Sequence, residues 1–331
     1  MSNEEKVAAE ANLADRFGAV TLAATAGRTS NANDEGAAAA AAKGGTSGRE
    51  EGGGQQPSSM GGTMQKLERI GRFDPVLFAE PPPRAICDIC MLPLPLDERL
   101  SSYSNCCGKM LCGACDRGHQ MASYKVNEKK TTKRQPLLDN LCPFCRVPLA
   151  KGMDEIKARL EKRAEMGDPT AIKDLGFSYM EGGKGYPVDH GKALEYLLKA
   201  AEMGNAAAYY GLGGLYIKGG GEIDIDVVLG TQYLRQGAKR GDIQSRHMLG
   251  LIEYEIFGDK DLAVKHWRTA AAAGLKKSAD KLIKCCREGI ISKSDLEGYL
   301  RAKHEAWAEM HSEERGKYIQ FLKRTEGYEE K

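Results

Sequence analysis

The chain has 331 residues, and its 48 basic and 46 acidic side chains give a formal net charge of +2. This balance excludes a chain-wide electrostatic attraction to nucleic acid or to an anionic membrane. No stretch approaches the roughly 18 apolar residues needed to cross a bilayer, and the acidic first residues are unlike those of a secretory leader. We therefore expect an intracellular protein, cytoplasmic, nuclear or both, with no membrane contact.

Residues 1–83 are predicted to form a disordered arm. They are built largely from Ala, Gly, Ser, Thr and Asn, and large apolar side chains are sparse. Such a segment buries too little surface to offset the entropy lost when its backbone becomes ordered. The arm ends in Pro81-Pro82-Pro83, which favours a stiff, extended spacer.

Residues 84–150 contain eight of the ten cysteines. Cysteines inside a cell stay reduced unless a metal holds them. Six of the eight form pairs separated by two residues, a gap that lets both thiolates of a tight turn reach one tetrahedral ion. The pairs are Cys87/Cys90, Cys112/Cys115 and Cys142/Cys145, and the remaining two cysteines are the adjacent Cys106 and Cys107.

Eight thiols suffice for two four-thiolate metal sites. Soft sulfur ligands favour zinc over calcium or magnesium, and the spacing fits neither common ferredoxin pattern of the rival iron–sulfur sites. The segment is too short for a large hydrophobic core, so metal ligation would supply much of its folding energy. The sequence therefore predicts a small domain with two zinc ions.

This segment resembles a RING finger, in which two zinc ions are held by interleaved ligand pairs. In the common RING form a histidine stands two residues after the third ligand, but Lys109 occupies that place after Cys107. The resemblance is thus to an all-cysteine variant, with His119, one helical turn after Cys115, as the alternative donor. It implies a first site of Cys87, Cys90, Cys112 and Cys115 and a second site of Cys106, Cys107, Cys142 and Cys145.

The RING resemblance also implies an activity, that of an E3 ubiquitin ligase. In such ligases an apolar residue of the first pair and the proline of the last pair hold the ubiquitin-conjugating enzyme (E2), and here these are Ile89 and Pro143. Arg146, directly after the last cysteine, matches the residue that bridges E2 and ubiquitin, a role that suits the planar guanidinium fork. The alternative is a zinc-stabilised scaffold or adaptor without catalysis, in which these side chains merely pack or are solvated.

A basic run, Lys129–Arg134, lies in the long loop before the last cysteine pair. It is a candidate for phosphate binding or nuclear import, but we favour a solvated loop. There is no paired histidine spacing and no recognition-helix signature, so direct base reading is not expected.

Residues 154–300 contain a repeat. An Ala-x-x-Gly segment recurs with its glycine at Gly167, Gly204, Gly241 and Gly274, and a leucine follows eight residues after each glycine. Each unit carries apolar positions three and four apart, which is typical of two amphipathic helices. Because one helix pair cannot cover its own apolar face, neighbouring units must stack into a solenoid.

The repeat is similar to Sel1-like repeats, a subclass of the tetratricopeptide-like solenoids. The resemblance implies a mainly α-helical fold whose solenoid binds a protein or peptide partner. Residues 301–331 are charged and are predicted to be a capping helix and tail that cover the last apolar face.

Overall fold

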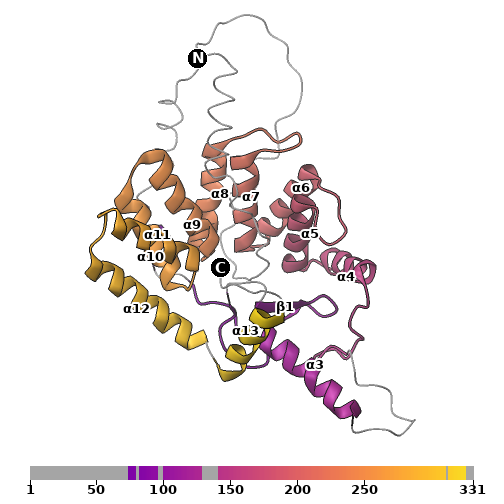
Figure 1. The fold of residues 1–331 in the computed structure, drawn as a ribbon. Coiled ribbons are helices and arrows are strands. Elements are labelled where there is room, and N and C mark those ends of the chain that lie inside the picture. Colours follow the sequence, from indigo (N-terminus) through magenta and orange to yellow (C-terminus); the bar gives the residue numbers. More distant parts are fainter. Residues whose placement is uncertain (1–73, 80–81, 96–99, 129–140, 311, 326–331) are drawn as a thin grey trace, which may run out of the picture.

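The computed structural model describes residues 74–79, 82–95, 100–128, 141–310 and 312–325 (Figure 1). Most of the predicted arm and the basic run 129–134 lie outside the described residues. The described part is mainly helical, as predicted, with a small cysteine-rich unit preceding an array of paired helices. None of its helices combines the length and apolarity needed to span a bilayer.

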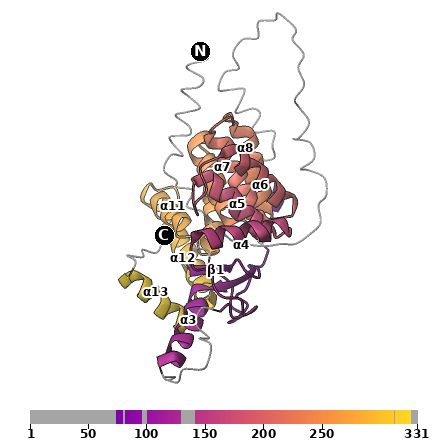
Figure 2. The ribbon, with the colours of Figure 1, turned by 90° about the vertical axis from the view of Figure 1, so that its right-hand side faces the viewer.

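The helical array is built from antiparallel pairs that stack side by side, as Figures 1 and 2 show. α4 precedes three complete pairs, and α11 and α12 follow them. The bounds are α4 (Met153–Glu165), α5 (Pro169–Glu181), α6 (His190–Glu202), α7 (Ala206–Lys218), α8 (Val227–Lys239), α9 (Ile243–Ile252), α10 (Lys260–Ala272), α11 (Lys276–Arg287) and α12 (Lys293–Met310).

The helices of the three pairs begin at side-chain caps. At each start a carboxylate or amide oxygen accepts a hydrogen bond from a backbone N–H of the first turn, which satisfies a donor that the helix itself cannot. Gly204, in the connection between α6 and α7, has a φ of +81°, a conformation that favours glycine. The capping residues are Asp168, Asp189, Asn205, Asp226, Asp242 and Asp259.

One continuous core runs through the array. Leu175, Leu212, Leu249 and Leu282, the leucines that follow the repeat glycines, are all buried in it. In the third unit the inner loop is shorter, and the chain turns there through a π-helix, η3 (Glu253–Phe257). The difference in repeat length is thus absorbed between α9 and α10 without interrupting the core.

The cysteine-rich unit is a hairpin followed by a helix. Strands β1 (Ser101–Ser104) and β2 (Lys109–Cys112) pair antiparallel, with Ser101 opposite Cys112, and α3 (Gly113–Glu128) begins directly after β2. Its core is small and contains the apolar side chains Leu94, Met110 and Leu111 beside two of the cysteines.

The C-terminal residues differ from the predicted cap. α12 does cover the end of the array, with Leu296, Tyr299 and Leu300 packed on the core. Because α12 extends from Lys293 to Met310, the expected boundary at residue 301 falls inside this helix. α13 (Glu313–Thr325) leaves the array and packs beside α3 (Figure 1). Its apolar positions, which include the buried Leu322, find their partner on the cysteine-rich unit.

The arm also differs from its prediction at its C-terminal end. Residues 74–79 are not a disordered tether, because Asp74 caps a short 3₁₀ helix, η1 (Pro75–Phe78), that packs on α8 and α10. Leu77 is completely buried there. Burial of this side chain against the array stabilises the ordered segment by a free energy that the composition of the arm does not indicate.

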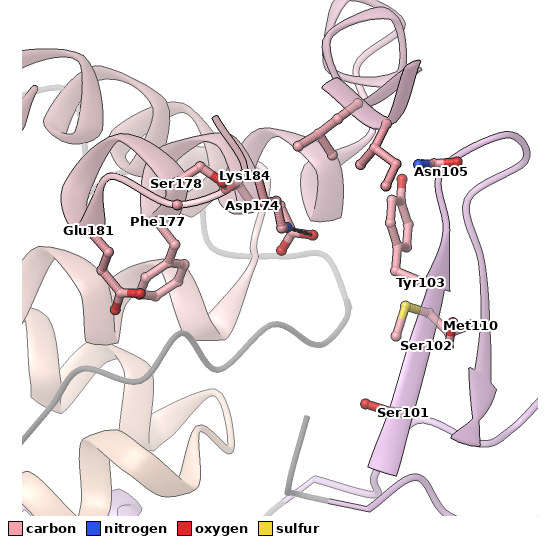
Figure 3. A pocket seen from close by; sticks show the side chains of 13 residues that line it. Ser101, Ser102, Tyr103, Asn105, Met110, Asp174, Phe177, Ser178, Glu181 and Lys184 are labelled. Atoms are coloured by element: carbon pink, nitrogen blue, oxygen red, sulfur yellow. Dashed lines mark hydrogen bonds and ion pairs between the residues drawn. The ribbon is translucent and has the colours of Figure 1, made fainter. Parts of the chain in front are cut away.

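The cysteine-rich unit rests on the start of the array. The Tyr103 hydroxyl donates to Asp168 Oδ2 at 2.7 Å, and the same oxygen accepts from Arg163 at 2.5 Å. A cavity of about 440 Å³ lies beside this contact, between the hairpin and α4 and α5. Figure 3 shows Met110 and Tyr103 facing Asp174 and Phe177 across it.

Candidate metal centre

Three tight turns carry six of the eight cysteines of the two clusters. In each turn the residue after the last cysteine has a left-handed backbone, with φ of +58° at Met91, +76° at Gly108 and +60° at Arg146. Hydrogen bonds from Met91 N to Cys87 O and from Arg146 N to Cys142 O close two of the turns. The pair Cys112/Cys115 instead spans the junction of β2 and α3.

The first cluster combines the pairs Cys87/Cys90 and Cys112/Cys115. The sulfur atoms of Cys87, Cys90, Cys112 and Cys115 all lie within 4.8 Å of one another. Cys90 and Cys112 Sγ are 3.9 Å apart. The backbone N–H of Cys112 also donates to Cys87 Sγ at 3.3 Å, which ties the first turn to the end of β2.

The second cluster combines the adjacent cysteines with the last pair. The sulfur atoms of Cys106, Cys107, Cys142 and Cys145 lie within the same 4.8 Å limit. Cys107 and Cys142 Sγ are 3.6 Å apart, and Cys145 and Cys106 Sγ are 3.5 Å apart. Both adjacent cysteines therefore face the cluster.

The donor set and its dimensions fit a tetrahedral ion. With Zn–S bonds of roughly 2.3 Å, neighbouring sulfurs of a tetrahedron are about 3.8 Å apart, close to the distances between the cysteine sulfurs in both clusters. Four soft thiolates are also the donor set that zinc accepts. Each cluster could hold one metal ion.

The electrostatics of the clusters favour a cation. Burial raises the pKa of Cys87, but the N–H groups of Cys112, Cys90 and Ile89 directed at its sulfur outweigh this and lower the pKa to about 7. At Cys107 burial dominates and the neighbouring thiols add to it, raising the pKa to about 11. Four adjacent sulfurs cannot all ionise without a compensating positive charge.

Arg315 of α13 supplies one positive charge to the first cluster. Its guanidinium donates to Cys90 Sγ at 3.3 Å, to Pro93 O at 2.7 Å and to Leu92 O at 3.4 Å. The side chain is only 5% exposed. Two further contacts anchor the helix: the Arg117 guanidinium lies over the Phe321 ring, and an added Cβ at Gly113 would collide with the Tyr318 ring.

The other residues singled out from the sequence lie around the clusters. The His119 ring donates to Leu141 O, with an Nε2–O distance of 2.9 Å, and belongs to neither cluster. Lys109 forms an ion pair with Asp88 at 3.6 Å. Ile89 is exposed on the first turn, Pro143 is half-buried on the last turn, and Arg146 is exposed directly after it.

Two contacts were not predicted from the sequence: that of Arg315 with the first cluster, and the hydrogen bond by which His119 joins α3 to Leu141, just before the last cysteine pair. Arg315 lies 225 positions from Cys90, and no spacing rule connects them. The one available signal was the apolar spacing of Tyr318, Phe321 and Leu322, which indicates that this charged helix has one face to bury.

Comparisons with known proteins bear on the helical array. Residues 169–205, 206–242 and 245–275 each match the Sel1 repeat family. A Sel1 repeat protein from Oxalobacter formigenes is 26% identical, with a TM-score of 0.43, over 48% of this chain and 66% of that protein. The protective antigen c5321 of uropathogenic Escherichia coli strains, which displays an SLR fold, is 17% identical, with a TM-score of 0.37, over 66% of this chain and 50% of that protein.

No curated protein gives a significant match to the sequence. The family matches confirm three Sel1 repeats, α5 to α10, as the spacing of the first repeat glycines predicted. Sel1 repeats indicate a scaffold for protein–protein interaction.

Proposed function

We propose that the chain is a RING-type E3 ubiquitin ligase with two zinc ions, in which the Sel1 repeats bind the protein to be modified or another partner. The single observation that carries the proposal is the pairing of the cysteines. Alternate pairs along the chain share a cluster, and in both clusters the four sulfurs lie within 4.8 Å of one another. This interleaving is what the RING resemblance implies.

The zinc ions would act by fixing the turns that carry the E2-binding residues. Ile89 and Pro143 belong to turns of different clusters, so two ions would hold the two halves of one docking surface. Arg146 extends from the end of the last turn and would hold ubiquitin in an attack-ready pose. Catalysis would then come from positioning alone, without a nucleophile on this chain.

The test is ubiquitin chain formation by the zinc-loaded full-length protein with a panel of E2 enzymes. We expect activity with at least one E2 and its loss when Ile89→Ala removes E2 binding. Arg146→Gly should retain E2 binding but slow transfer at least about tenfold, because it removes only the bridging side chain. Glycine is the suitable replacement, since at a φ of +60° it relieves rather than adds backbone strain.

Zinc content and the circular dichroism spectrum serve as controls for both variants. Absence of chain formation with every E2, on folded protein that carries two zinc ions, would reject the ligase proposal. A non-catalytic scaffold predicts instead that Arg146→Gly leaves partner capture by the Sel1 repeats and every other measured property unchanged.

A further inference from the structure

The η1 segment is bound to the Sel1 repeats as a peptide ligand would be. Leu77 inserts into the array and is 0% exposed. The Phe78 ring lies 4.9 Å from the His266 ring, and the Asp74 carboxylate pairs with Lys239 at 2.6 Å. One acidic group and two apolar side chains therefore make side-chain contacts with α8 and α10 in this short stretch.

The surface beneath the segment contains two buried polar side chains, the cationic Arg246 and the neutral His266. Arg246, which is 1% exposed, donates through its guanidinium to the backbone carbonyl oxygen of Leu77, and to Ala238 O at 3.3 Å. Neither ring nitrogen of the buried His266 has a hydrogen-bond partner among the described residues. Burial, together with Arg246 and Arg235, lowers the pKa of His266 to about 3. A helix array that needed only a hydrophobic core would not place such groups here.

The third repeat differs from the other repeats at these positions. Arg246 stands five residues after the repeat glycine, where the other units have Ile172, Tyr209 and Ala279. The position of His266 is a tyrosine in the two preceding units, Tyr196 and Tyr233. Both replacements thus lie in the third pair, α9 and α10, which together with α8 of the second pair surrounds η1.

We infer that this surface of α8, α9 and α10 is a binding site for a partner peptide with an acidic residue three places before a Leu-Phe pair, and that residues 74–78 occupy it as an internal competitor. The inference deepens the proposed partner-binding role of the Sel1 repeats. Recognition combines an ion pair with Lys239, a hydrogen bond from Arg246 to a main-chain carbonyl and burial of the leucine side chain in the core of the array. A partner must displace the chain's own segment, whose effective concentration is of millimolar order for a short tether.

The test uses a fluorescein-labelled peptide of residues 72–80 and the full-length chain. The double variant L77S/F78S removes the two apolar anchors of the internal segment and should free the site. We expect this variant to bind the peptide at least about tenfold more tightly than the wild-type chain does, because the internal competitor is gone. Val76→Ser is the matched control, since Val76 is 53% exposed and its loss should leave the site closed.

Specificity is tested with Lys239→Glu in the double-variant background. The Lys239 side chain is partly exposed, at 32%, so we expect the change to preserve the fold. It removes the cation that faces the acidic residue, and peptide affinity should fall about tenfold. A peptide carrying Leu77→Ser should not bind. Equal affinity of the wild-type and L77S/F78S chains for the peptide, no binding to either, or no effect of Lys239→Glu would overturn the inference.

Analytical ultracentrifugation tests whether the site is instead occupied by the η1 segment of a second copy of the chain. A wild-type dimer that L77S/F78S abolishes would show that the segment is exchanged with a second copy, which also overturns the partner assignment. The affinity measurement involves no ubiquitin or E2, so its failure is separate from failure of the ligase proposal.

Discussion

Arg315 and the first cysteine cluster form a local charge balance. A divalent ion bound by four thiolates leaves two negative charges on a site that is largely buried. The N–H groups of Arg315 donate directly to Cys90 and to the carbonyls of Leu92 and Pro93, which fix the first turn. Groups that orient a metal ligand in this way commonly change metal affinity by about 10–100-fold.

We predict that Arg315→Lys weakens zinc binding at the first cluster by about tenfold. A lysine keeps the charge but cannot donate in the planar fork that spans a sulfur and two carbonyls. The measurement is titration with a chelator, with released cysteines alkylated and assigned by peptide mass spectrometry. The second cluster is the internal reference, and Arg324→Lys, exposed on the same helix, is the control. Equal weakening of both clusters would contradict a specific role for Arg315.

Individual residues were predictable where spacing encodes geometry. A two-residue gap brings both cysteines of a pair together because such a gap is a local structure, whereas the grouping of pairs into two sites came only from the RING resemblance. Arg315 was not predictable, because its position depends on how α13 folds back from the far end of the chain. The sequence alone showed that Lys109 stands where the common RING form has a histidine ligand. In the structure Lys109 forms an ion pair with Asp88.

At the level of elements, the close approach of α7 and α8 depends on two glycines. An added Cβ at Gly213 would lie 2.7 Å from Leu234 and 3.0 Å from the carbonyl oxygen of Gly230. At Gly230 it would lie 2.9 Å from the carbonyl oxygen of Gly213. The backbones of the pair thus touch where any larger residue would force them apart.

Gly213→Ala should therefore destabilise the array by about 1–3 kcal/mol through overpacking, even though alanine is the better helix former. Gly298 on α12 provides the matched control, because nothing lies within 4 Å of a Cβ built there. Gly298→Ala should stabilise by up to about 1 kcal/mol. Urea unfolding followed by circular dichroism measures both free energies, and a stabilising Gly213→Ala would disprove the close contact.

Helix pairs were predictable as elements, whereas two docked segments were not. The 37-residue spacing between the first repeat glycines encodes two helices and a turn, and such packing recurs between neighbours in sequence. The position of η1 depends instead on Arg246 and His266, more than 160 residues further along the chain. Composition alone placed residues 74–79 in an unstructured arm because a single buried leucine hardly changes an average over 83 residues.

In the whole molecule, the cysteine-rich unit joins the two ends of the structure. Tyr103 holds it to Asp168 at the start of the first matched repeat, and α13 holds it to the end of the chain. Its own apolar core is small. If zinc supplies the rest of its stability, these connections depend on the metal as well.

Metal removal should therefore unfold more of the chain than residues 84–150. We predict that a strong chelator raises hydrogen exchange in 82–95 and 100–128 and, in the same step, in α13, because Arg315 and Phe321 lose the turns and helix on which they pack. Helices α5 to α10 should keep their protection, since their core is continuous and contains none of the eight clustered cysteines. Exchange followed by mass spectrometry, with and without restored zinc, resolves these segments. If α13 stays protected after complete zinc removal, its contacts with α3 are independent of the metal. If α5 to α10 unfold in the same step, the array itself depends on the cysteine-rich unit.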